Sequence, residues 1–442
     1  MPLPPGGMSG TMDEEGGLPT LGGEVARASE RAKGAAKAQA KFEPLVFRDA
    51  IVKHLSSCAP NDYDSIAAKL DALGSQLDLR RYENEFFQLL LVGYVLAPGG
   101  TPVEDGGVGR CIFSVATTGE GDKVDVKELK KAVNVFERLM RRYKYLQHDF
   151  EESALQQLLG YVGRFPPVEQ ERLSIAAALF QQVGLAPVSV IGAVKSAHLV
   201  KEGVAQTCLL NFLRAYPANG EPIEPVLAAL RKAGLAELDA FFPPGKRSAA
   251  EITAALKGKG LNSVADWYVK SKTAAVKDEV NKKVKSLLAD NADAEEIVSE
   301  LEPVAARSVP ALVSDADFVS LVFLALVSRI NLNAEGTVVV DDVLKQIKDY
   351  GAVLEPFTQR AVAEVALINT IQVWVNDNPK LVPAFLRILK TLVSEDVLSV
   401  GPLVYWRNKG SKPNGRAELV AKAEPLIKFL EEQEEEEDSD EE

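Results

Sequence analysis

The sequence has 442 residues, with 50 Lys and Arg against 63 Asp and Glu and a formal net charge of -13. This length exceeds what one hydrophobic core usually organises, so it predicts two or three domains. The negative charge argues against a nucleic-acid-binding protein that relies on overall charge, although a local basic patch is compatible with it.

The N-terminal half predicts a helical domain behind a disordered arm. Residues 1–40 are first rich in Gly and Pro and then in Ala, Lys and Arg, a composition that is typical of disorder. From residue 42 the apolar spacing is helical, with helices expected at 47–55, 66–73 and 80–96. The sequence APGG should end the third helix, residues 101–121 should form a Gly-rich loop, and a broken helical stretch is expected over 124–164.

The C-terminal half continues the same pattern after Pro243-Pro244-Gly245, where we place a domain boundary. Further helices are expected at 249–256, 263–288, 293–301, 317–330, 338–350, 356–375, 379–392 and 417–430. The short β-branched run at 337–340 is the one strand signal. We therefore predict an all-α, HEAT-type α-solenoid of antiparallel helix pairs, divided into an arm (1–40), two helical domains (41–243 and 248–432) and a disordered acidic tail (433–442).

The cysteine and histidine positions are typical of neither a metal centre nor a catalytic triad. They are scattered, without a CxxC motif: Cys58, Cys111, Cys208, His54, His148 and His198. The motifs GxxxxGK[ST], GxSxG and HExxH are absent as well, so we expect neither an enzyme nor a bound cofactor. Unpaired thiols fit a reducing compartment.

The apolar segments predict a protein outside the membrane. None approaches the roughly 20 residues that span a bilayer, and the run at 318–330 is more typical of a buried helix. The N-terminus lacks the basic-then-apolar order of a secretory signal. A cytoplasmic location is therefore expected.

A leucine heptad at Leu70, Leu77, Asn84 and Leu91 resembles a zipper with one polar position. Gly74 interrupts the heptad, and no basic region of the kind that grips DNA precedes it. These residues are more typical of two successive solenoid helices.

A basic and aromatic segment, FERLMRRYKYLQHDF, occupies residues 136–150. Its cations could grip RNA phosphates while its rings stack on bases: Arg138, Arg141, Arg142 and Lys144. Alternatively, the rings face the core and the arginines pair with acids of a neighbouring helix. We favour the second interpretation, so direct RNA binding is a possible but secondary function.

The C-terminal segment carries the strongest functional signal. In SEDVLSVGPLVYWRN, apolar residues should pack inward while Glu395, Asp396 and Trp406 lie near the surface. From residue 431 the chain is almost entirely acidic, and Pro425 should kink or break the helix that leads there. Carboxylates beside aromatic rings suit a lysine-rich ligand, because a ring face attracts ammonium groups; a solubilising tail behind a core tryptophan is the alternative.

These segments resemble a known family. The DVL-apolar-Trp pattern followed by EPLIKFLEEQEEEEDSDEE is similar to the two acidic-aromatic boxes that close the W-two domain of translation initiation factor 5 and of the epsilon subunit of the factor 2 exchange factor. The segments KFEPLVFRDAIV, LAPGG and RRYKYL resemble the factor 5 mimic proteins, also called basic-leucine-zipper-and-W-two-domain proteins. The resemblance runs from about residue 42 to the end and implies a domain like the middle domain of factor 4G followed by a W-two domain.

The resemblance also implies a function. Mimic proteins lack the catalytic N-terminal domain of factor 5, and their W-two domain binds the lysine-rich boxes of the factor 2 beta subunit, with the factor 3 complex as a further partner and ribosome association indirect. Competition with factor 5 would then alter start-codon selection. The implied partner surface is Glu395, Asp396, Tyr405, Trp406, Phe429, Glu431, Glu432, Glu434, Glu435, Glu436, Glu437 and Asp438.

Two other functions remain open at this point. A guanine-nucleotide exchange factor would use the W-two domain as the epsilon subunit does. An RNA-binding scaffold would use the basic segment at 136–150.

Overall fold

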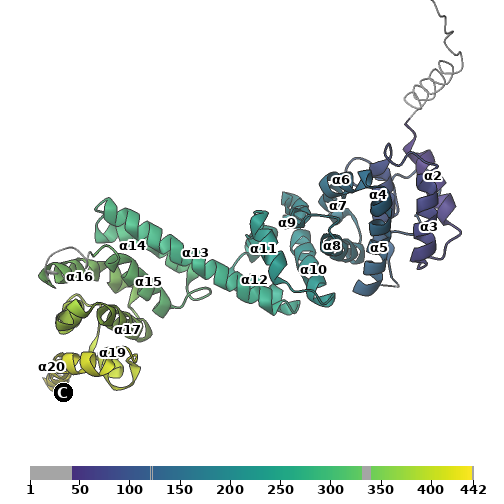
Figure 1. The fold of residues 1–442 in the computed structure, drawn as a ribbon. Helices are drawn as coiled ribbons and strands as arrows, with labels where there is room; N and C mark the ends of the chain where they lie inside the picture. Colours follow the sequence, from purple (N-terminus) through teal and green to yellow (C-terminus); the bar gives the residue numbers. More distant parts are fainter. Residues whose placement is uncertain (1–41, 120, 122, 331–339, 441–442) are drawn as a thin grey trace, which may run out of the picture.

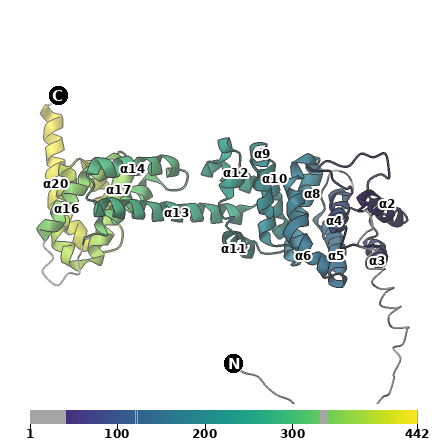
Figure 2. The same ribbon diagram turned by 90° about the horizontal axis from the view of Figure 1, so that it is seen from above.

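The computed structural model describes residues 42–119, 121, 123–330 and 340–440, with side chains as far as residue 436. Figures 1 and 2 show two groups of helices joined by one long helix, α13 (Asn262–Ala289). Within the described residues no strand forms, and Leu96 and Pro102 make an isolated β-bridge. The predicted arm at 1–40 and most of the run at 337–340 lie outside the described residues.

The N-terminal group is built from short helices and 3-10 turns. Its α-helices before the long linker are α2 (Pro44–Leu55), α3 (Tyr63–Gly74), α4 (Glu83–Val92), α5 (Val126–Arg142), α6 (Tyr145–Asp149), α7 (Leu155–Gly160), α8 (Pro167–Gln182), α9 (Ala197–Lys201), α10 (Val204–Ala218), α11 (Glu224–Lys232) and α12 (Ala249–Gly258). The 3-10 and π segments between them are η1 (Val115–Thr117), η2 (Phe150–Ala154), η3 (Val162–Arg164), η4 (Val188–Lys195), η5 (Leu238–Phe241) and η6 (Pro244–Lys246).

The C-terminal group repeats the pattern with longer helices. It contains α14 (Ala294–Ser308), α15 (Asp315–Val327), α16 (Val340–Leu354), α17 (Ala361–Asp377), α18 (Phe385–Ser394), α19 (Val400–Tyr405) and α20 (Arg416–Asp440). The intervening turns are η7 (Glu355–Phe357), η8 (Pro379–Ala384) and η9 (Trp406–Gly410). Packing of α8 on α10 and of α15 on α17 gives the stacked helix pairs of a HEAT-type solenoid, which confirms the predicted fold class.

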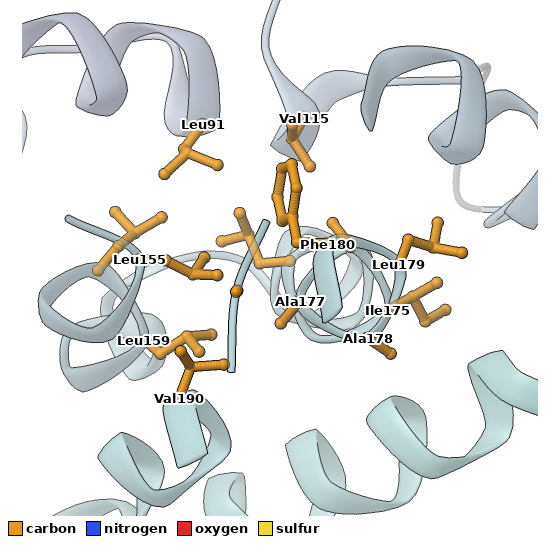
Figure 3. Packing of buried hydrophobic residues seen from close by; sticks show 14 of the residues in the cluster. Leu91, Val115, Leu155, Leu159, Ile175, Ala177, Ala178, Leu179, Phe180 and Val190 are labelled. Atoms are coloured by element: carbon orange, nitrogen blue, oxygen red, sulfur yellow. The ribbon is translucent and has the colours of Figure 1, made fainter. Parts of the chain in front are cut away.

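The first core is centred on α8, whose stretch 173–180 is almost entirely apolar and buried at every position. Ile175, Ala177 and Phe180 are fully buried, and Figure 3 shows them against side chains from α4, α7, η1 and η4. The small alanine side chains let neighbouring helices approach closely, and the large rings fill the space between them. A helix that is apolar on all sides is stable only when it is covered on all sides.

The two hydrophobic cores meet within α13 rather than at the proline pair. Side chains up to Tyr268 belong to the first core, and those from Val276 onward belong to the second. The predicted punctuation at Pro243-Pro244-Gly245 falls in the loop and 3-10 turn that precede α12, which Ser248 and Glu251 start with a capping box. The division into domains at 243–248 stays a prediction, and buried side chains of the first core lie on both sides of it.

Several predicted helix ends differ from the structure, and two of them have a clear physical cause. The helix expected at 80–96 ends at Val92, because Gly93 adopts φ 85° and its N–H caps the carbonyl of Leu89. The helix expected at 417–430 continues to Asp440 and contains Pro425 without ending there. Buried apolar residues of α20 lie on both sides of that proline, and this packing outweighs the one backbone hydrogen bond that a proline removes.

The leucine heptad is divided between two helices, as expected. Leu70 lies in α3, Leu77 lies in the following loop, and Asn84 and Leu91 lie in α4. The predicted buried helix at 318–330 is also present as α15.

Candidate acidic and aromatic surface

The strongest sequence signal lies at the far end of the C-terminal group, where α18, α19, η9 and α20 pack together. Figure 2 shows the end of α20 extending away from the other helices. The acidic residues after 430 are therefore carried on a helix as far as Asp440, rather than on the disordered tail that composition predicted from 433. Glu is a good helix former, and the packed first half of α20 provides the nucleus from which the helix propagates.

Trp406 is part of the core, so the prediction that it lies near the surface is wrong. Its side chain is 0% exposed, and its ring centroid lies 5.9 Å from that of Phe385 on α18. The indole N–H donates to Oε1 of Gln372 on α17 at 3.0 Å. Burial of the ring is stable because its single polar group has a partner. Trp406 therefore supports the surface from beneath and presents no face to a ligand.

Two amide side chains of α17 hold the segment that leads from η9 into α20. Gln372 donates to the carbonyl oxygens of Lys412 at 2.7 Å and Asn414 at 2.6 Å. Asn369 donates to the carbonyl oxygen of Gly410 at 2.9 Å and accepts from the N–H of Lys412 at 3.0 Å. Buried amides that bond several backbone groups at once fix the position of a loop.

Sequence reasoning missed this pair of amides. The available signal was the presence of Asn369 and Gln372 within a run that is otherwise largely apolar, VALINTIQVWV at 365–375. A polar residue at a buried helix position needs a partner, but the sequence does not identify the partner.

The first acidic segment, 395–398, turns the chain after α18. Val397 and Leu398 are buried, as predicted, whereas Asp396 is exposed. Glu395 is half-buried against Gly351 and lies 3.6 Å from Nζ of Lys348. Asp396 has φ 57°, the left-handed conformation that usually selects glycine at a helix C-terminus. The structure therefore keeps an acidic residue where neither backbone geometry nor the helix dipole favours one.

Two aromatic rings are exposed at this end of the molecule. Tyr405 is 55% exposed and packs over Gly410, and Phe429 on α20 is 53% exposed. Glu432, Glu434, Glu435 and Glu436 are exposed along the same helix, whereas the side chains of Glu437 and Asp438 lie outside the described part. Exposed rings beside carboxylates form a surface that can bind organic cations.

Glu431 is already paired within the molecule. Its two carboxylate oxygens accept from Nη1 and Nη2 of Arg407 at 2.7 and 2.9 Å. This hydrogen bonding lowers the pKa of Glu431 and raises the pKa of Arg407. Glu431, one of the acids predicted at this surface, is therefore already engaged by a guanidinium.

The basic segment at 136–150 follows the interpretation that we favoured. Phe136 and Phe150 are buried, while Arg138 pairs with Asp64 and Arg142 lies 2.7 Å from Asp71, both on α3. Arg141 pairs with Glu137 on its own helix at 2.5 Å, and Lys144 is exposed. The arginine charges are thus balanced by nearby acids, which lowers their attraction for phosphates.

Other candidate chemistry is sparse in the described part of the chain. Cys58, Cys111 and Cys208 are free and buried. No cluster of three or more His, Cys, Asp or Glu suited to a metal ion occurs among the described residues. No described helix combines the length and apolar character needed to cross a membrane.

Comparison with known proteins supports the same regions. The family model described as "5MP1/2 HEAT domain" matches residues 30–278, and the model described as "eIF4-gamma/eIF5/eIF2-epsilon" (W2) matches residues 363–440. The second match includes the α17 amides, Trp406 and α20.

Full-length relatives agree with these matches. The chain is 28% identical over 406 residues to eIF5-mimic protein 1 of Mus musculus and of Homo sapiens, covering 90% of this chain and 94% of each relative. It is 27% identical over 425 residues to eIF5-mimic protein 2-A of Danio rerio, covering 96% of this chain and 97% of that relative. Because the first family model spans more than half of the 442 residues, the chain belongs to the eIF5-mimic protein family.

Proposed function

We propose that this protein is a non-enzymatic, cytoplasmic regulator of translation initiation that competes with factor 5 for factor 2, altering start-codon selection. Its ligand would be the lysine-rich segments of the factor 2 beta subunit, with the factor 3 complex as a further partner. One observation carries the proposal: exposed acids of α20 lie on the same helix as exposed Phe429, within the region that matches the W2 model. Family membership and the relatives' names give the translational setting.

The physical basis is cation binding by a prearranged surface. Each ammonium group over an aromatic face gains about 0.5–1 kcal/mol at an exposed site. The acidic run adds long-range attraction, which raises the association rate and weakens as salt increases. Because the acids are carried on a helix, less conformational freedom is lost on binding than a disordered tail would lose.

The same groups favour binding over catalysis. Exposed carboxylates and an exposed ring on one helix can attract a basic chain, whereas a reaction usually needs an enclosed site that excludes water. Glu395, Asp396, Tyr405, Phe429 and the acids of α20 remain the proposed partner surface. Trp406 is buried beneath this surface and supports it by packing.

A truncation tests the proposal directly. Deleting residues 432–442 removes the exposed acids but retains Glu431 and its pair with Arg407. We expect the dissociation constant for a lysine-rich beta-subunit peptide to rise about tenfold at low salt, equivalent to about 1.4 kcal/mol. The melting temperature should stay nearly unchanged. Wild-type protein that ignores the peptide even in dilute buffer would refute the proposal.

Competition is the second test, because a mimic must exclude the protein it resembles. Adding this protein should displace labelled factor 5 from factor 2, and the truncated variant should do so only at higher concentration. Retention of factor 5 at saturating amounts of this protein would refute competition.

Separate assays address the two other functions. An exchange factor would accelerate GDP release from factor 2, whereas a stoichiometric competitor would not. An RNA scaffold would bind RNA with submicromolar affinity at about 0.15 M salt, and replacing Arg141 and Arg142 would abolish that binding.

A further inference from the structure

Arg407 places a positive charge within the acidic surface. Its side chain is 16% exposed and makes a two-pronged contact with Glu431, while Glu424 lies 3.9 Å away. Glu424 and Glu431 are seven residues apart on α20 and therefore share one face of the helix. A guanidinium matches a carboxylate better than a lysine ammonium does, because it offers two parallel donors.

Contacts other than this ion pair also hold α20 in place. Leu419, Ala423, Leu426 and Ile427 are buried in the second core on the first half of the helix. The α17 amides separately hold the chain between Gly410 and Asn414. Since apolar burial and these hydrogen bonds already anchor both sides, the Arg407–Glu431 pair is free to serve another purpose.

We propose that Arg407 is an internal competitor that occupies Glu424 and Glu431 and so weakens binding of a lysine-rich segment. This inference rests on the proposed function, and it concerns the regulation of that surface. An incoming lysine meets Glu431 already paired with Arg407, Glu424 at 3.9 Å from Arg407 and 3.6 Å from Lys428, and the like charge of the guanidinium. Lysines then bind mainly to the other exposed acids of the proposed surface, above all those of α20 beyond residue 431.

The expected effect is modest but measurable. An ion pair at a partly exposed surface contributes up to about 1 kcal/mol, which corresponds to about a fivefold change in affinity. Arg407→Gln should therefore tighten binding of a lysine-rich beta-subunit peptide by about two- to fivefold at low salt. High salt should reduce the gain, because both the pair and the ligand attraction are electrostatic.

Arg416→Gln provides a matched control. It removes the same charge from the same end of the molecule, but Arg416 is exposed and donates to the carbonyl oxygen of Asn408 rather than to an acid of this surface. A long-range charge effect would raise the affinity of both variants alike. A local competitor requires the gain in peptide affinity of Arg407→Gln to exceed that of Arg416→Gln.

Two further variants sharpen the test. Arg407→Lys keeps the charge but lacks the two-pronged geometry, so its affinity should lie between those of the wild type and Arg407→Gln. In the Arg407→Gln background, Glu431→Gln should reverse the gain, because it removes the carboxylate that was freed. Circular dichroism and hydrogen exchange over residues 416–436 establish that each variant keeps α20.

The outcomes distinguish this inference from the proposed function. Equal gains for Arg407→Gln and Arg416→Gln, or weaker binding by Arg407→Gln, would overturn the competitor role. Binding of the peptide by Arg407→Gln but not by the wild type would support the competitor role while refuting the proposed function. If neither the wild type nor any variant binds the peptide, both the proposed function and the competitor role are refuted.

Discussion

The indole N–H of Trp406 and the side-chain oxygen of Gln372 are joined by a 3.0 Å hydrogen bond inside the second core. The same Gln372 oxygen also accepts from the N–H of Lys412 at 3.2 Å. One buried amide therefore couples the aromatic residue of the first acidic-aromatic segment to the loop that precedes α20.

Trp406→Ala should act on stability first. Removing a fully buried tryptophan leaves a large cavity and lowers the free energy of unfolding by about 3–5 kcal/mol. Denaturant unfolding would measure the loss. Tyr405→Ala is the control, since that ring is 55% exposed and its loss should change stability by less than about 0.5 kcal/mol. Tyr405→Ala alone should weaken peptide binding while leaving stability unchanged. If Trp406→Ala left stability unchanged, the burial of Trp406 would be contradicted.

Asp396→Gly should stabilise the protein while weakening the binding of lysine. Asp396 has φ 57° at the end of α18, where glycine avoids the steric cost of a side chain, and we expect a gain of roughly 0.5–1 kcal/mol. Thermal unfolding and peptide titration would measure the two effects. Asp396→Asn separates charge from backbone geometry, because asparagine tolerates the same conformation. A glycine variant that is less stable than the wild type would contradict this account.

Glu83 should make stability depend on pH near neutrality. Burial, together with hydrogen bonding to Asp149, raises the pKa of Glu83 from 4.5 to about 7. Because the folded protein holds this proton more tightly than the unfolded chain, the stabilisation is complete below about pH 4.5 and is lost as the pH rises through about 7. Melting temperatures measured from pH 5 to pH 8 should fall less steeply for Glu83→Gln than for the wild type. Identical slopes would exclude Glu83 as the cause.

Arg110→Met should destabilise the protein, because Arg110 anchors the glycine-rich loop at 101–121 to neighbouring elements. Arg110 donates to Glu169 at 2.7 and 2.8 Å and to the carbonyl oxygen of Val92, and its guanidinium lies 4.9 Å from the ring of Tyr94. Removing it leaves a largely buried carboxylate unpaired, at a cost of about 3 kcal/mol in unfolding free energy. The double variant Arg110→Met/Glu169→Met should recover part of that loss in a denaturant titration. A double variant as unstable as the single one would show that the carboxylate is not responsible.

The helical class and the acidic end followed from the sequence alone. Apolar spacing identified helices such as α15, and the charge run after residue 430 identified the acidic segment, because both are local patterns. The ends of α4 and α20 did not follow, since Gly93 caps the first and packing carries the second past Pro425. Local propensity predicts which residues form a helix better than where tertiary contacts end it.

Only the tertiary structure decided which side chains the surface presents. Sequence placed Trp406 beside carboxylates, but burial against α17 and α18 removed it from the surface and left Tyr405 and Phe429 exposed. The sequence alone also suggested that Glu431 is available to a partner. In the folded protein, Arg407, which lies 24 residues earlier, forms an ion pair with it. Composition determines how many charges a segment carries, but the packing of distant helices determines which of those charges remain available to a partner.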